Sequence, residues 1–272
     1  MITSINKEDF LEILPISCVE SYILASLKKM DYPVEYTYFE SFISVQHAFN
    51  DYVHHIFNFS YYDGIERIQN IASRLDLLKI KRNKTLSLPV FDQRYMFLFS
   101  IKPECLLQSY GKQALRQDHY VYIKQLNEDY LYINNNPLHQ KRITRPEIES
   151  FYDGEYIRVE FTEKQLEAQD IKNKMVFRIC KELDYSWSKY NINDIDLVDI
   201  SNLFAYLNIS WKRTDLLINA LFNANLNISQ VLNDTILKIA YMKMRNNWDR
   251  EYITRVFTEL DKTQESIKNL LC

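Results

Sequence analysis

Apolar side chains recur at helical spacing along residues 14–30, LPISCVESYILASLKKM. The positions that share one face of a 3.6-residue period are Val19, Tyr22, Ile23, Ser26, Leu27 and Met30. This pattern predicts a buried amphipathic helix that begins near Cys18. Pro15 favours an extended segment before the helix, because proline lacks a backbone N–H and restricts the residue that precedes it.

The middle of the chain has the composition of short strands. The runs rich in β-branched and aromatic residues are 94–101, 119–124, 129–133 and 156–161. Asn127 and Glu128 read as a hairpin turn between two of them. Pro137 ends the second strand of that hairpin, because proline cannot continue the hydrogen-bond ladder. Thr144 is a predicted cap for a short helix over residues 145–151.

From residue 162 onward the apolar pattern is helical throughout, and the helices it predicts are long. The strands all lie before this point. The chain is therefore expected to have an α+β fold, with a mixed domain over residues 1–161 and an all-α domain over residues 162–272.

Composition is typical of a globular protein, with 47% hydrophobic and 25% charged residues. The formal net charge of −3 provides no general attraction to nucleic acid, so no nucleic-acid partner is expected. No apolar run approaches the roughly 18 residues that a membrane-spanning helix needs, and no membrane partner is expected.

The first residues, MITSINKEDFLEIL, do not resemble a signal peptide. The four cysteines, Cys18, Cys105, Cys180 and Cys272, are scattered and form no C-x-x-C pair. This spacing predicts neither a disulfide framework nor a cysteine metal site, and it favours a reducing cytoplasm.

The chain has only three glycines, Gly64, Gly111 and Gly154, and no phosphate-cradling loop can be written from them. This excludes ATP and NAD chemistry by the familiar glycine-rich routes. His47, His54 and His55 are not at a zinc-binding spacing, since adjacent histidines on a helix diverge by about 100°. Neither a metal nor a resident cofactor is expected.

The densest positive cluster is KIKRNK, which contains Lys79, Lys81, Arg82 and Lys84. Such runs are most often solvated loops. In a chain that is slightly acidic overall, this run is also a candidate landing site for an acidic partner protein.

Cys18 is the candidate nucleophile. A cysteine in the first turn of a helix feels the backbone N–H groups and the positive end of the helix dipole, and both favour the reactive thiolate. The alternative is a small core residue, because cysteine is often buried without any chemical role.

The order of Cys18, then His119 opening a strand, then Asn135 ending the next strand is a papain-type layout. The histidine accepts the thiol proton, and the carboxamide holds the ring in the required tautomer. Asn134 and Asn136 are alternatives to Asn135, because a shift of one residue in strand register would place either of them beside the imidazole.

The succession DHYVYIK, DYLYINN, a basic stretch, a short helix and FYDGEYIRV resembles the leader-cleaving peptidase domains of bacteriocin exporters. Together with SCVESYILASL near the N-terminus, it is still more similar to the butirosin-type acyltransferases of natural-product biosynthesis. Kinship with the cysteine-protease-like amide-forming enzyme of closthioamide assembly is a further expectation that rests on no particular residue.

The resemblance implies a papain-like cysteine peptidase fold over residues 8–161, followed by the helical domain. It implies Cys18 as nucleophile, His119 as base and Asn135 as the residue that orients the base. The implied activity is amide formation in antibiotic biosynthesis. An acyl group would pass from a carrier-protein thioester through Cys18 to an amine, with phosphopantetheine presented by the acyl or peptidyl carrier protein.

Two alternatives stay open, a cysteine peptidase that trims a precursor peptide and an inactive papain-like interaction module. Papain-like peptidases place an oxyanion-binding glutamine about six residues before the cysteine, and here that position is Glu12. An ionised carboxylate would repel the oxyanion. This departure weighs against peptide cleavage more than against transfer from a thioester, which is already activated.

Overall fold

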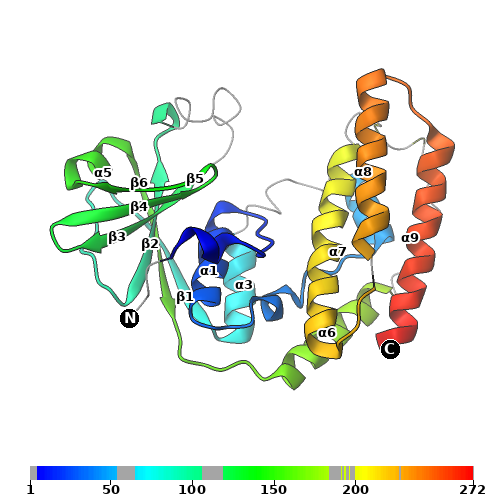
Figure 1. Ribbon diagram of the computed structural model, residues 1–272, viewed down its shortest axis with the longest axis horizontal. Helices are drawn as coiled ribbons and strands as arrows, with labels where there is room; N and C mark the ends of the chain where they lie inside the picture. The colour runs from blue at the N-terminus through cyan, green and yellow to red at the C-terminus, as the bar shows by residue number, and fades with distance from the viewer. Residues whose placement is uncertain are drawn as a thin grey trace. The chain divides into compact units, whose positions relative to one another are not determined.

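The computed structural model describes residues 5–53, 65–105, 119–183, 191, 193, 196, 200–226 and 228–271. The chain divides into two compact units. The first comprises residues 1–34 and 62–165, and the second comprises residues 35–61 and 166–272. Helices occur in both units, and a six-stranded antiparallel sheet lies in the first (Figure 1). The predicted α+β class is therefore confirmed.

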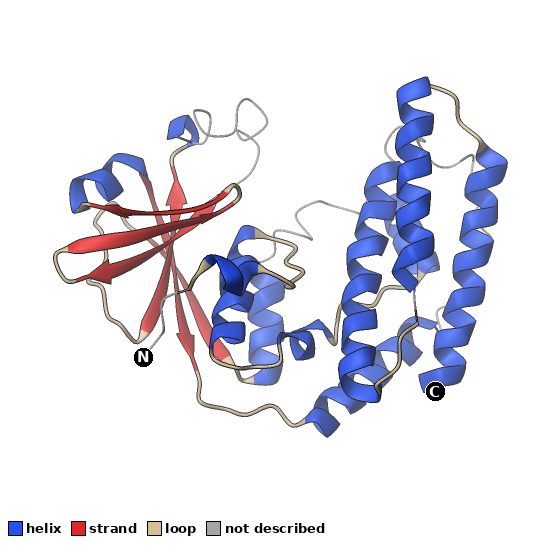
Figure 2. Cartoon of the chain, in the orientation of Figure 1, coloured by secondary structure: helices blue, strands red, loops and turns tan. Residues whose placement is uncertain are grey.

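The elements of the first unit are η1 (Lys7–Phe10), α1 (Cys18–Lys29), α3 (Ile65–Leu75), β1 (Leu78–Lys84), β2 (Tyr95–Ile101), β3 (Tyr120–Leu126), β4 (Asp129–Asn135), β5 (Leu138–Ile143), α5 (Arg145–Phe151) and β6 (Tyr152–Phe161). The elements of the second are α2 (Val45–Val53), α6 (Ala168–Leu183), α7 (Ile200–Phe222), α8 (Ile228–Arg245) and α9 (Arg250–Leu271). The short helix η2 (Val34–Tyr38) spans the boundary between the units. Figure 2 shows the strands confined to the first unit.

The sheet has the strand order β1-β6-β2-β3-β4-β5. Helix α1 contacts β3 and β4, and α3 contacts both β1 and α1, so the two helices lie side by side against the sheet (Figure 1). An aromatic and aliphatic core gathers alternate residues of the strands, such as Phe97 and Phe99, with Ile148 of α5. Tyr22 of α1 packs near Tyr122, which lies between the core residues Val121 and Ile123 on β3. Because successive strand residues point to opposite faces, α1 and α5 cover different faces of the sheet.

The predicted central hairpin is confirmed. Strands β3 and β4 pair from Leu126 opposite Asp129 to Tyr122 opposite Ile133. Asn127 in the turn has a φ of 54°, in the left-handed region that asparagine tolerates better than most residues. The helix predicted over residues 145–151 is also present as α5.

The basic run forms an edge strand rather than a loop. Strand β1 pairs along its whole length with β6, and Leu78 is buried while Lys79 and Lys81 are exposed. Strand β5, which the sequence did not predict, forms the opposite edge and carries His139, Lys141 and Arg142 on exposed positions. Charged side chains on edge strands discourage pairing with other chains, which accounts for the polar composition of both strands.

Residues 35–61 belong to the helical unit, although they precede the sheet in sequence. Buried Trp211 of α7 donates its Nε1 proton to the carbonyl of Ile43 at 3.0 Å, and its ring stacks on Phe42 with centroids 6.1 Å apart. The backbone N–H of Val45 donates to Oε1 of Gln264 on α9 at 2.6 Å. These long-range contacts place residues 35–61 with the C-terminal helices, so the two units are not separated by a single division of the chain at residue 161.

The cysteine spacing predicted no disulfide framework, and one of the described cysteines departs from that expectation. Cys180 on α6 is disulfide-bonded. Cys18 and Cys105 are not in disulfides, and Cys272 lies outside the described residues. Sequence spacing did not reveal the bridge because disulfide pairing depends on distances in the folded chain. None of the described helices combines the length and the apolar composition needed to cross a membrane.

Candidate active site

Cys18 is the first residue of α1, as the sequence predicted. Ser17 caps the helix, because its Oγ accepts a hydrogen bond from the backbone N–H of Glu20 at 3.2 Å. Cys18 is partly exposed and not in a disulfide. Cys18 therefore lies at the positive end of the helix dipole, a position that in general favours a thiolate.

His119 directly precedes β3, and its imidazole meets Asn134 of β4. The ring Nε2 lies 2.7 Å from Oδ1 of Asn134, whose side chain is buried. The amide nitrogen of Asn134 donates to the backbone carbonyls of Asn136 and Pro137 at 3.1 and 3.3 Å. These two bonds assign the amide orientation, with its oxygen facing the imidazole.

This arrangement selects one tautomer of His119. Because Asn134 presents an acceptor, Nε2 carries the proton and the lone pair of the neutral ring remains on Nδ1. Burial lowers the pKa of His119 below its ordinary value of 6.5, and the hydrogen bond to Asn134 opposes that shift in part. The neutral ring, with its lone pair on Nδ1, therefore persists into mildly acidic solution.

The asparagine that contacts the imidazole is Asn134, whereas the resemblance implied Asn135 as the orienting residue. The side-chain Oδ1 of Asn135 lies 3.3 Å from the hydroxyl of Tyr22 on α1. Asn136, the other alternative, contributes its backbone carbonyl to Asn134. The difference follows from strand alternation, since neighbouring residues on β4 face opposite sides of the sheet.

Helix α1 is attached to the hairpin beside the His119–Asn134 pair. Tyr22, one helical turn after Cys18, has its hydroxyl 3.2 Å from the carbonyl oxygen of Tyr120. The backbone N–H of Asn135 donates to the same hydroxyl at 3.0 Å. Tyr120 and Asn135 are the chain neighbours of His119 and Asn134, so one side chain of α1 joins the helix to both strands at this point.

Glu12 lies away from the start of α1. Its carboxylate is 3.2 Å from Nζ of Lys28, and its side chain is 87% exposed. Lys28 is ten residues beyond Cys18, a rise of about 15 Å along the helix. The ion pair therefore holds the Glu12 carboxylate near the far end of α1.

Two of the four cations in the basic run are engaged within the sheet. Arg82 bonds to Glu155 of β6, and Nζ of Lys84 lies 3.8 Å from the same carboxylate. Tyr120 also donates to Glu155. Burial would raise the pKa of Glu155, but the hydrogen bonds from Arg82 and Tyr120 outweigh it and lower that pKa. Lys79 and Lys81 are the exposed cations of the run without a carboxylate within 4 Å among the described residues.

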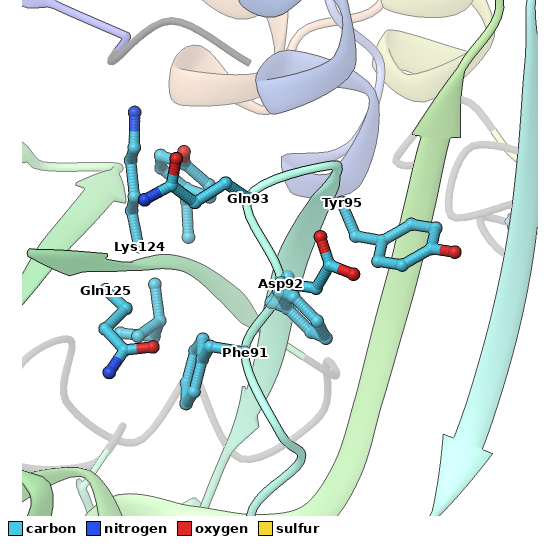
Figure 3. A pocket seen from close by; sticks show the side chains of 9 residues that line it. Phe91, Asp92, Gln93, Tyr95, Lys124 and Gln125 are labelled. Atoms are coloured by element: carbon cyan, nitrogen blue, oxygen red, sulfur yellow. The ribbon is translucent and has the colours of Figure 1, made fainter. Parts of the chain in front are cut away.

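A small hollow lies at the far end of β3 from His119. It is lined by residues that include Phe91, Asp92, Gln93, Tyr95, Lys124 and Gln125, which Figure 3 shows converging from β3 and from the segment that leads into β2. Its volume of about 20 Å³ has room for about one water. The hollow is therefore too small for a substrate, although burial there lowers the pKa of Lys124.

No group of three or more metal-ligating side chains occurs within the described part of the chain. Of the histidines considered for a metal, His54 and His55 lie outside that part. His47 instead bonds to Glu182 of α6, with Nδ1 and Oε2 2.8 Å apart.

Comparison of the chain with protein-family models, with curated proteins and with solved structures finds no match.

Proposed function

We propose that this protein is a cysteine-dependent acyltransferase of the papain-like type, with Cys18 as nucleophile, His119 as base and Asn134 as the residue that orients the base. The observation that supports this most directly is the 2.7 Å contact between Nε2 of His119 and Oδ1 of Asn134. It leaves Nδ1 as the basic atom, which is the requirement for taking a proton from a thiol.

The proposed first half-reaction forms an acyl-enzyme. His119 takes the proton of Cys18, and the thiolate attacks the carbonyl carbon of an acyl thioester. The carbon–sulfur bond to the carrier thiol breaks, and the proton held by His119 goes to the leaving thiolate. One thioester is exchanged for another, so the bond energy changes little in this step.

In the second half-reaction an amine attacks the acyl-enzyme. The amine loses a proton to His119, the bond to Cys18 breaks, and that proton returns to the thiolate of Cys18. The product is an amide. First-turn backbone N–H groups of α1 are the proposed oxyanion donors in both steps, and the distance of Glu12 from Cys18 supports this role because no carboxylate repulsion arises from that residue.

The proposed donor is an acyl or peptidyl carrier protein that presents its substrate on a phosphopantetheine arm. Carrier proteins of this kind are expected to be acidic, so a cationic landing site is required. The exposed Lys79 and Lys81 on edge strand β1 are the best candidates, since Arg82 and Lys84 already pair with Glu155. The acceptor is a small-molecule amine, and the proposed setting is natural-product biosynthesis.

Intact-mass spectrometry tests the proposal. The full chain is mixed with an acyl-pantetheine thioester in the absence of an amine, and one acyl adduct should appear that is missing in Cys18→Ala. Adding a primary amine should discharge the adduct and yield the amide. Cys105→Ala is the matched control, because this partly exposed thiol is also outside any disulfide and should be dispensable.

Three outcomes would contradict the proposal. Loss of the adduct in Cys105→Ala but not in Cys18→Ala would place the reaction elsewhere. Cleavage of a peptide that depends on Cys18, with no loading from thioesters, would favour the peptidase alternative. Failure of Cys18 to react with either an acyl thioester or a peptide would favour an inactive interaction module.

A further inference from the structure

We infer that Tyr22 is a positioning residue, whose hydroxyl sets the alignment between Cys18 and the His119–Asn134 pair. The inference rests on the proposed function and names a residue outside the three proposed above. The supporting observation is the position of the Tyr22 hydroxyl between the backbone groups of β3 and β4.

The register of the hairpin shows what the hydroxyl replaces. The β3–β4 pairing extends from the turn as far as Tyr122 opposite Ile133. In an antiparallel pair, hydrogen-bonded positions recur every second residue, so the next such pair would be Tyr120 opposite Asn135. There the N–H of Asn135 donates to the Tyr22 hydroxyl at 3.0 Å, and the hydroxyl lies 3.2 Å from the carbonyl oxygen of Tyr120.

The phenol oxygen therefore stands between two backbone groups that would otherwise bond directly. It also lies 3.1 Å from the carbonyl of Ile133 and 3.3 Å from Oδ1 of Asn135. A hydroxyl has one proton to donate, so these acceptors share it. The phenol oxygen thus separates the ends of β3 and β4. At this point the β3–β4 pairing stops, and the side chains of His119 and Asn134 bond to each other.

The same side chain connects this place to the nucleophile. Cys18 and Tyr22 are four residues apart on α1, so their Cβ atoms lie about 6 Å apart on the same side of the helix. Figure 1 shows α1 running beside the sheet, and the helix contacts both β3 and β4. One structural link between the thiol and the imidazole therefore runs through one turn of α1, the Tyr22 hydroxyl and the backbone of Tyr120, which follows His119.

The ring and the hydroxyl of Tyr22 have separable roles. The ring is fully buried, in edge-to-face contact with Phe10 at 5.9 Å and near Tyr122 at 6.4 Å. A Tyr22→Phe substitution keeps these contacts and removes only the oxygen. The strand ends would then either bond directly or admit a water, and both changes move His119 relative to Cys18.

The test measures the reactivity of Cys18 rather than turnover. Iodoacetamide alkylation is followed at the Cys18 peptide by mass spectrometry as a function of pH. In the wild type the midpoint should lie below about 8.5, the value of an ordinary thiol. Tyr22→Phe should move it toward that value and slow alkylation at pH 6 by about 10- to 100-fold, the scale expected for misplacing a catalytic group by about 1 Å.

Tyr152→Phe is the matched control. Tyr152 is also a buried tyrosine of the first unit, and its hydroxyl donates to the carbonyl of Thr85 at 2.7 Å. Both variants lose a phenol-to-backbone hydrogen bond and should lose similar thermal stability. Only Tyr22→Phe should change the alkylation profile, because only its hydroxyl touches the neighbours of His119 and Asn134.

The outcomes separate the two proposals. A depressed Cys18 midpoint in the wild type that Tyr22→Phe leaves unchanged would overturn the positioning role and leave the proposed function standing. An ordinary midpoint that His119→Ala does not alter would overturn both. If Tyr22→Phe does not fold, Asn135→Ala decides, since it removes one partner of the hydroxyl. It should give a smaller shift in the same direction, and no shift would overturn the inference.

Discussion

Nε2 of His119 lies 2.7 Å from Oδ1 of Asn134, while the adjacent Asn135 turns its side chain to Tyr22 of α1. Two consecutive asparagines at the end of β4 thus serve different partners. Asn134 fixes the tautomer of the histidine, and Asn135 fastens the strand end to the helix that begins at Cys18. This division of roles leads to the first prediction.

Asn134→Ala should slow acylation of Cys18 by up to about 100-fold, because the imidazole loses the acceptor that fixes its tautomer and its angle. Asn135→Ala should have a smaller effect, since the backbone N–H that bonds to Tyr22 is retained. Single-turnover loading from an acyl-pantetheine thioester measures both rates. A larger loss in Asn135→Ala than in Asn134→Ala would reverse the assignment of the orienting residue.

The pH dependence of acylation should reflect the burial of His119. Burial lowers the pKa of His119 below 6.5, so the neutral base is present above that lowered value and is lost only as the pH falls through it. The acidic limb of the loading rate should therefore lie below pH 6.5. Asn134→Ala should move the limb further down, because the hydrogen bond that His119 donates to Asn134 raises the pKa of His119. An acidic limb above pH 6.5 in the wild type would contradict the prediction.

Charge reversal on β1 should weaken carrier-protein use selectively. Lys79→Glu with Lys81→Glu should raise the apparent KM for carrier-bound substrate by about tenfold at low salt, and less at high salt, because steering between charges is screened. The KM for acyl-pantetheine should be unchanged. Lys141→Glu with Arg142→Glu on the opposite edge strand is the control. Equal losses with both substrates would indicate a structural role for β1 instead.

The stability of the helical unit should depend on pH through His47 and Glu182. The hydrogen bond with Glu182 raises the pKa of His47 despite burial, aided by the charges of Glu182 and Asp51, whereas the charge of Arg178 opposes the rise. Burial would raise the pKa of Glu182, but its bond with His47 and the nearby Arg178 lower it. The stability contributed by His47 is thus present below about 6.5 and lost as the pH rises through the raised pKa.

The contribution of Glu182 is present above about 4.5 and lost as the pH falls through its lowered pKa. The unit should be most stable between these limits. Tryptophan fluorescence reports on this unit alone, because Trp187, Trp211 and Trp248 all belong to it. His47→Gln should flatten the alkaline side of the profile of melting temperature against pH, and an unchanged profile would contradict the prediction. His139→Gln, at an exposed position in the other unit, is the control.

The sequence alone determined the elements whose signals are local. Helix α1 follows from its apolar period, and Ser17 caps it. The hairpin follows from two β-branched runs around Asn127, and α5 follows from Thr144, whose N–H donates to Glu147 at 2.7 Å. Each signal lies within a few residues of the element it specifies, so local propensity and capping suffice. The candidate residues Cys18 and His119 were found because they stand at the starts of such elements.

Only the tertiary structure decided which asparagine faces His119. Residues 134–136 are all asparagines, so the sequence does not distinguish them. Strand alternation and the contact of Asn135 with the Tyr22 hydroxyl do. The edge strands β1 and β5 and the inclusion of residues 35–61 in the helical unit were likewise decided by distant partners, such as Trp211 for Ile43. These features depend on contacts between residues far apart in sequence. A local hydrophobic pattern carries no information about such contacts. Packing in the folded chain selects among the arrangements that the pattern allows.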